Sequence, residues 1–170
     1  GDDKHILLWD TRSHSQPASS QLRCLTQPTA MQWFSEHQLI FGTEAGNLVR
    51  FDLRAQRSLR TEPAFATEQC RVTRIEPMVN KKMVACVAQD AHQVLFYDKE
   101  LTSLKHRERY PAKVDIRAVH ALKHGKERGK VIAVGTEQSV YLHDSATIFD
   151  NNNNPHHQHS SKSTAESIVL

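Results

Sequence analysis

Four short apolar runs recur along the chain, and each of them ends on an aspartate. The closing aspartates lie 42, 46 and 46 residues apart. No window of ten or more residues keeps apolar positions three and four apart, which is the spacing that an amphipathic helix needs. The pattern therefore predicts short strands at a nearly fixed period. The four runs are residues 6–10, 48–52, 94–98 and 140–144.

Each of the last three runs is preceded by two other strand candidates, and each of the first three is followed by a more polar one. The nearer upstream run (39–42, 84–87, 131–135) is joined to the closing run by a short turn, as in a β-hairpin. The remaining candidates are residues 30–34, 72–75 and 116–122 upstream, and 21–25, 58–65 and 101–109 as polar outer strands. Four strands every 42 to 46 residues is the period of a β-propeller blade. We therefore predict an all-β chain whose residues 1–149 form about three and a half four-stranded blades, the C-terminal part of a propeller.

The position before each closing aspartate holds a side chain with a ring. These residues are Trp9, Phe51, Tyr97 and His143, followed by Asp10, Asp52, Asp98 and Asp144. A ring at the end of a blade's third strand fills the wide space between neighbouring blades. The aspartate then starts the turn to the outer strand. We interpret the four aspartates as turn residues and not as catalytic groups.

The pair Trp9-Asp10 resembles the signature of WD40 repeats. Asp3 lies six residues before Trp9, at the place of the tight-turn aspartate of that family. The resemblance implies a WD40-type β-propeller. The later repeats depart from it, with Ala45, Ala91 and Glu137 at the turn position. We therefore expect apolar packing between blades to replace the buried hydrogen-bond network of strong WD40 blades.

Several segments taken together resemble one family of WD-repeat proteins. In chain order they are WDTR at 9–12 with PAS at 17–19, FGTEAGNL at 41–48, CRVT at 70–73, YDKELTSL at 97–104 and VDIRA at 114–118. Their order and near-spacing are similar to the C-terminal half of the WD-repeat subunit of the methylosome, over about residues 1–122. The Asn-rich and His-rich tail resembles that of the divergent germ-line members.

That resemblance implies a non-catalytic scaffold that holds no cofactor. Members of the family bind a type II protein arginine methyltransferase and help to present Arg/Gly-rich substrates for symmetric dimethylation. The substrates include Sm proteins and, in germ cells, Tudor-linked proteins. The resemblance also implies a cytoplasmic location, with the nucleus and germ-line granules as further sites. Because the main enzyme-contacting surface of the family lies in N-terminal blades, it assigns no contact residue to this chain.

Arg12 supports a different binding function. The run ILLWDTR at 6–12 matches the WD-x-Arg box of substrate receptors of cullin-RING ubiquitin ligases, where the arginine faces the ligase adaptor. Residues 51–54 are a weaker copy that ends on Arg54. Arg12 and Arg54 are therefore candidate partner-binding residues, and a ligase substrate receptor is the alternative function. An RNA-binding propeller is a more distant alternative, because the basic stretches 105–109 and 123–130 contain Glu and lack aromatic residues.

Composition and motifs argue against most catalytic functions. The formal net charge is +3, no apolar run has the length of a membrane span, and no Gly-rich loop of the phosphate-binding type is present. Three cysteines are an odd number, which fits reduced thiols in the cytosol or nucleus. Cys70 or Cys86 could pair with His120 as a nucleophile and base, but Cys86 lies in an apolar run and is expected to be buried.

Residues 150–170 differ in composition from the rest of the chain. Four Asn precede a cluster of His156, His157 and His159, and Ser and Lys follow. Such a segment buries too little apolar surface to become ordered. A structural zinc site needs four ligands that a fold holds in place. We therefore predict a disordered tail, no metal site and no cofactor.

Overall fold

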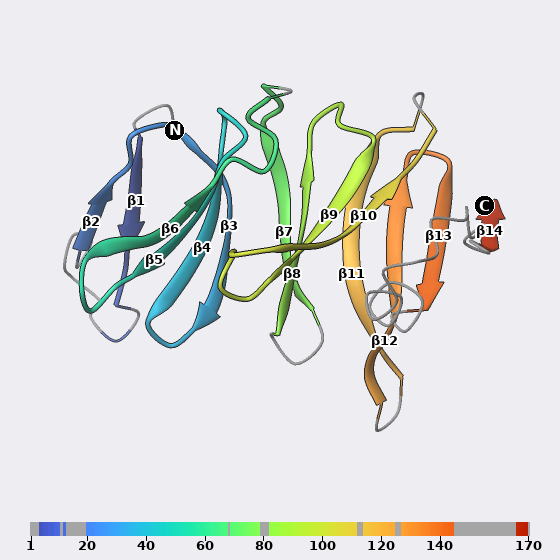
Figure 1. Ribbon diagram of the computed structural model, residues 1–170. Helices are drawn as coiled ribbons and strands as arrows, with labels where there is room; N and C mark the ends of the chain where they lie inside the picture. The colour runs from blue at the N-terminus through green and yellow to red at the C-terminus, as the bar shows by residue number, and fades with distance from the viewer. Residues whose placement is uncertain are drawn as a thin grey trace.

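A computed structural model of the chain describes residues 4–10, 12, 20–67, 69–78, 82–111, 114–124, 127–144 and 166–169. Its elements are β-strands, grouped into four antiparallel sheets that stand side by side (Figure 1). We call them the first to the fourth sheet in chain order. The all-β prediction is confirmed for this part of the chain.

The first sheet has two strands and the others have four each. In sequence they are β1 (His5–Leu8) and β2 (Ser20–Arg23); β3 (Pro28–Ser35), β4 (Gln38–Thr43), β5 (Leu48–Asp52) and β6 (Arg57–Glu62); β7 (Val72–Met78), β8 (Met83–Ala88), β9 (Gln93–Asp98) and β10 (Leu104–Arg109); and β11 (Ile116–His124), β12 (Glu127–Thr136), β13 (Ser139–Asp144) and β14 (Glu166–Val169). Within each four-stranded sheet the spatial order follows the chain order. The predicted unit of four consecutive antiparallel strands is therefore confirmed three times.

The tail prediction needs one correction. Residues 145–165 and 170 lie outside the described residues, but Glu166–Val169 forms β14 and pairs with β13, with Ser139 opposite Val169 and Leu142 opposite Glu166. These four residues include Ile168 and Val169, β-branched residues that favour strands. The free edge of β13 offers unpaired backbone groups to them. Composition alone did not reveal this strand because it is short and follows a long polar segment.

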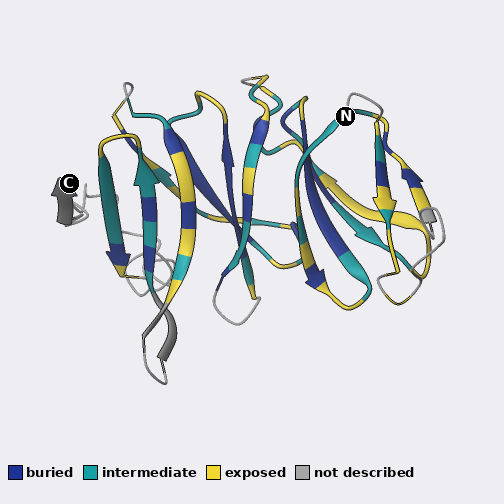
Figure 2. Cartoon of the chain, turned by 180° about the vertical axis from the view of Figure 1, so that it is seen from behind, coloured by how far each residue is buried: buried dark blue, intermediate teal, exposed yellow. Residues whose placement is uncertain are grey.

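The middle strands β4, β8 and β9 are buried on both faces. In β4, Leu39 and Phe41 pack toward the first sheet, whereas Ile40 packs toward the third. Strands β4, β8 and β9 are therefore nearly continuous apolar runs, while the outer strand β6 is almost wholly exposed (Figure 2). Burying one Leu, Ile or Phe side chain contributes about 1.5–3 kcal/mol. The expected apolar packing between blades is thus what holds adjacent sheets together.

One face of β3 lacks such a cover. Met31 of β3 occupies the position that Ile75 occupies in β7. Each lies two residues after the bulged residue of its strand, which is Thr29 in β3 and Thr73 in β7. Ile75 is 7% exposed, whereas Met31 is 49% exposed and Trp33 50%. The first sheet contributes only β1 and β2, and an open pocket lies where residues 5–7 of β1 meet residues 28–31 of β3.

Candidate protein-interaction site

The closing aspartates of β5 and β9 organise turns. Oδ1 of Asp52 accepts hydrogen bonds from the backbone N–H of Arg54 at 2.9 Å and of Ala55 at 3.0 Å. Asp98 accepts from the backbone and hydroxyl of Thr102 and from the hydroxyl of Ser103, at 2.7–2.8 Å. These bonds satisfy backbone donors that leave the strand, which is the role that turn aspartates fill.

Asp10 makes a similar turn and also holds Arg12. Its carboxylate accepts from the Arg12 backbone N–H at 3.0 Å, from Nε at 3.0 Å and from a terminal guanidinium nitrogen at 2.9 Å. The hydrogen bonds from the Arg12 side chain lower the pKa of Asp10 to about 2. The Arg12 side chain is nevertheless 89% exposed. A partner that approaches Arg12 therefore meets a paired guanidinium.

Arg54 occupies the corresponding place in the second sheet, two residues after Asp52, and it is exposed. In the third sheet the same place holds Glu100, which forms an ion pair with Arg50 of β5 across the boundary between sheets. The Arg50 side chain is only 12% exposed and also donates to Gln38 at 2.9 Å. Burial lowers the pKa of Arg50, and the charges of Asp52 and Asp98 oppose that shift. The same turn position therefore holds an exposed residue, Arg54, in the second sheet. In the third sheet it holds Glu100, whose ion pair links the third sheet to the second.

The ring positions before the aspartates do not share one environment. Tyr97 and His143 are each 4% exposed, Phe51 is half-buried against the first sheet, and Trp9 is 63% exposed. Trp9 follows β1, whose face away from the second sheet has no described neighbour. Asp144 ends β13 and is exposed, and Asp3 lies outside the described residues.

The two cysteines proposed as nucleophiles have different surroundings from His120. Cys86 is fully buried between the second and third sheets, and burial raises the pKa of its thiol well above the ordinary value. Cys70 is half-buried and packs against the same cluster. His120 is 63% exposed on β11 and lies 2.8 Å from a carboxylate oxygen of Glu76 on β7. The structure therefore does not bring these groups together as a catalytic pair.

A polar groove at the boundary of the third and fourth sheets was not predicted from the sequence. Arg117 lies there in the irregular first pairing of β11, where its guanidinium forms ion pairs with Asp115 and Glu137. Arg74 of β7 donates through Nε to the backbone oxygen of Arg117 at 3.2 Å. The groove has a volume of about 430 Å³. Thr29, Thr73 and Arg117 occupy the same bulged position in β3, β7 and β11, and this equivalence is visible only in the strand pairing.

The described residues hold no group of three or more His, Cys, Asp or Glu side chains that could bind a metal ion. The three cysteines are free thiols. The histidine cluster of the tail lies outside the described residues. In the described part of the chain, no helix is long and apolar enough to cross a membrane.

The comparison with solved structures supports this architecture. The β-propeller domain of Cps50 (Swd1) from Myceliophteria thermophila is similar to 69% of this chain, with a TM-score of 0.57 and 16% sequence identity. The chain has a WD40-like β-propeller fold. It spans 40% of the length of that solved propeller chain. Since 622 solved chains are similar, the fold by itself selects no single function. No family model and no curated protein matches the sequence.

Proposed function

We propose that the chain is part of a non-catalytic propeller scaffold that binds a type II protein arginine methyltransferase. The scaffold helps to present Arg/Gly-rich substrates, such as Sm proteins or Tudor-linked germ-line proteins, for symmetric dimethylation. It works without a cofactor, in the cytoplasm or in germ-line granules. The proposal combines the propeller fold with the resemblance to the methylosome WD-repeat subunit.

The observation that carries the proposal is the placement of the matching segments. WDTR contains the turn after β1, at Asp10, and YDKELTSL contains the turn after β9, at Asp98. CRVT and VDIRA both open a sheet, at β7 and β11. The segment FGTEAGNL forms the hairpin from β4 to β5. The resemblance therefore follows one architecture in register and is not a scatter of unrelated short motifs.

Affinity capture tests the proposal. A polypeptide that contains residues 1–170 should retain a symmetric arginine methyltransferase, detected by transfer of labelled methyl groups to an Arg/Gly-rich peptide. The methyl transfer should come from the captured methyltransferase, and the chain by itself should transfer no methyl groups. Capture of a cullin adaptor in place of the methyltransferase would contradict the proposal.

The exposure of Arg12 favours a second candidate, a substrate receptor of a cullin-RING ubiquitin ligase. Arg12→Ala separates the two functions. A buried charged contact with a ligase adaptor would lose about 2–5 kcal/mol of binding energy. The methyltransferase scaffold should keep its partner after the same change. Arg57→Ala is the control, because Arg57 is also an exposed arginine but lies at the start of β6, outside both box sequences.

A further inference from the structure

The same backbone hydrogen bond recurs in the first three sheets. A residue in the left-handed region lies shortly before β1, β5 and β9, with φ of 48°, 77° and 47° at Lys4, Gly46 and His92. Its carbonyl accepts the N–H of the residue shortly after the outer strand, at 2.7–2.8 Å. The donors are Cys24, Phe65 and Tyr110. These three residues therefore occupy equivalent places in successive sheets.

In two of the three sheets the equivalent residue is a ring that fills the boundary with the next sheet. Phe65 is fully buried in the cluster that also contains Leu95 and Tyr97. Tyr110 packs edge-on against Tyr141, with ring centroids 5.1 Å apart, and contacts His143. A ring at this place thus lies against two positions of the third strand in the following sheet.

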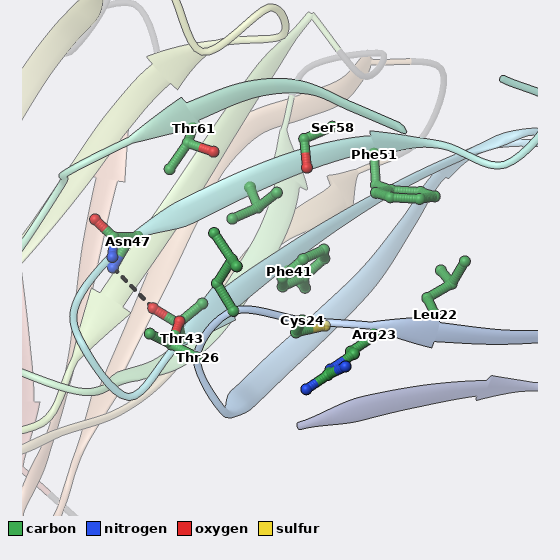
Figure 3. A pocket seen from close by; sticks show the side chains of 12 residues that line it. Leu22, Arg23, Cys24, Thr26, Phe41, Thr43, Asn47, Phe51, Ser58 and Thr61 are labelled. Atoms are coloured by element: carbon green, nitrogen blue, oxygen red, sulfur yellow. Dashed lines mark hydrogen bonds between the residues drawn. The ribbon is translucent and has the colours of Figure 1, made fainter. Parts of the chain in front are cut away.

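Cys24 stands at this place in the first sheet, and a cavity of about 190 Å³ lies beside it. The register equates Val49 and Phe51 with Leu95 and Tyr97, and both of them line the cavity. Figure 3 shows Cys24 beside Phe41, with Phe51 of β5 and Ser58 of β6 bordering the same space. Phe41 occupies the position in β4 that Cys86 occupies in β8, and it is the larger of the two residues. The cavity nevertheless stays open beside it.

We propose that this cavity, the aromatic socket, binds an aromatic side chain of a partner polypeptide. The socket is defined by Cys24, Phe41, Val49, Phe51, Ser58 and Thr61. What fits it is shown within the chain itself, because Phe65 and Tyr110 fill the equivalent space in the next two sheets. An apolar cavity of roughly 150 Å³ is large enough to hold benzene. A single buried ring is also the typical anchor of a protein–protein contact.

The lining selects the kind of ring. His143, which meets the Tyr110 hydroxyl at 2.8 Å, is replaced at the socket by Phe51. A phenol hydroxyl would therefore lose its imidazole partner there, whereas a phenyl ring loses nothing. None of the polar residues that line the cavity occupies the position of His143; they are Arg23, Thr26, Thr43, Asn47, Ser58 and Thr61. We expect phenylalanine-like rings to bind better than tyrosine-like rings.

The statement that the partner is a polypeptide rests on the proposed function. The binding of an aromatic ring does not, because small aromatic molecules test the socket directly. The probes are fluorobenzene and 4-fluorophenol, observed by ¹⁹F NMR in the presence of the full chain. Fluorobenzene should bind saturably and several-fold more tightly than 4-fluorophenol. Absence of saturable fluorobenzene binding would overturn the inference. A chain that binds the probe but captures no methyltransferase would refute the proposed function alone.

Two substitutions at one position provide the matched comparison. Cys24→Phe restores the ring of the other sheets, so it should lower fluorobenzene affinity at least tenfold and raise the melting temperature by a few degrees. Cys24→Ala keeps the space open and should change the affinity less than threefold. Equal affinity in wild type and Cys24→Phe would contradict the proposal.

Thiol protection gives a measurement that needs no variant. Fluorobenzene in the socket should slow alkylation of Cys24 several-fold, since Cys24 lines the socket. Cys70, half-buried in a different cluster, is the internal control and should react at an unchanged rate. Equal effects on both thiols, or none on Cys24, would contradict the proposed site.

Discussion

The hydroxyl of Tyr110 lies 2.8 Å from Nε2 of His143, and this bond joins the third sheet to the fourth. Both residues are less than 10% exposed. Burial lowers the pKa of His143; the charge of Glu108 opposes that shift and His106 adds to it. Burial also raises the pKa of Tyr110, so the phenol stays protonated. A neutral pair is therefore what the boundary between these sheets requires.

This pair should make stability depend on pH. Because the folded state lowers the pKa of His143, the unfolded chain binds more protons between the folded pKa and the ordinary value near 6.5. The free energy of unfolding should therefore be fully retained above about pH 6.5 and decrease as the pH falls below it. Chemical denaturation at a series of pH values measures this change.

His143→Phe is the control for that pH dependence, because Phe51 fills the same position in the second sheet. The variant should show a shallower loss of stability between about pH 6.5 and 5 than the wild type. Parallel curves for the two proteins would contradict a role for His143. Glu108, His106 and Tyr141 remain in both proteins, so their effects cancel to first order.

Removing only the Tyr110 hydroxyl tests the hydrogen bond itself. Tyr110→Phe keeps the ring on Tyr141 but leaves the His143 nitrogen without its buried partner. Leaving a buried polar atom unpaired costs about 1–3 kcal/mol. Thermal unfolding near pH 7 should show a lower melting temperature than wild type. The double variant Tyr110→Phe/His143→Phe should recover part of the loss, and additive losses would argue against the bond.

Gly46 should tolerate no side chain. Its φ is 77°, and an added Cβ would lie 2.5 Å from the backbone carbonyl carbon of Phe65. Gly46→Ala should therefore destabilise the fold by about 2 kcal/mol or more. At Gly135 an added Cβ would meet only Ala118, at an ordinary 3.6 Å. Gly135→Ala is the matched control, and equal melting temperatures for the two variants would show that the turn is placed wrongly.

The loss of stability on breaking the ion pair between Arg50 and Glu100 should depend on which of the two residues is replaced. Glu100→Ala leaves the largely buried Arg50 guanidinium without its carboxylate, at a cost of about 1–3 kcal/mol. Arg50→Leu removes the buried charge as well and should cost less. Urea unfolding of both variants makes the comparison. A larger loss for Arg50→Leu would show that the arginine stem, and not the ion pair, stabilises this boundary.

The strands could be predicted because each carries its own signal. A closing run such as Val94 to Asp98 has apolar residues, a ring and a turn aspartate within five positions. Contacts between sheets carry no such local signal. Glu100 and Arg50 are far apart in sequence, and the charge of Glu100 alone does not indicate a partner.

The aromatic socket was not predictable for a related reason. The separation between the left-handed residue and the residue that follows the outer strand changes by one from each sheet to the next, as in Lys4 to Cys24 and Gly46 to Phe65. A search for a fixed period therefore does not align Cys24 with Phe65 and Tyr110. Their equivalence becomes visible only through the shared backbone hydrogen bond.

Stimulation of a methyltransferase by the scaffold tests the central claim most directly. A type II arginine methyltransferase would be assayed on an Arg/Gly-rich peptide with and without a polypeptide that contains residues 1–170. The account predicts more symmetric dimethylarginine when the polypeptide is present, and none from the polypeptide alone. Methyl transfer by the polypeptide alone, or enzyme activity that does not respond to it, would contradict the proposed scaffold.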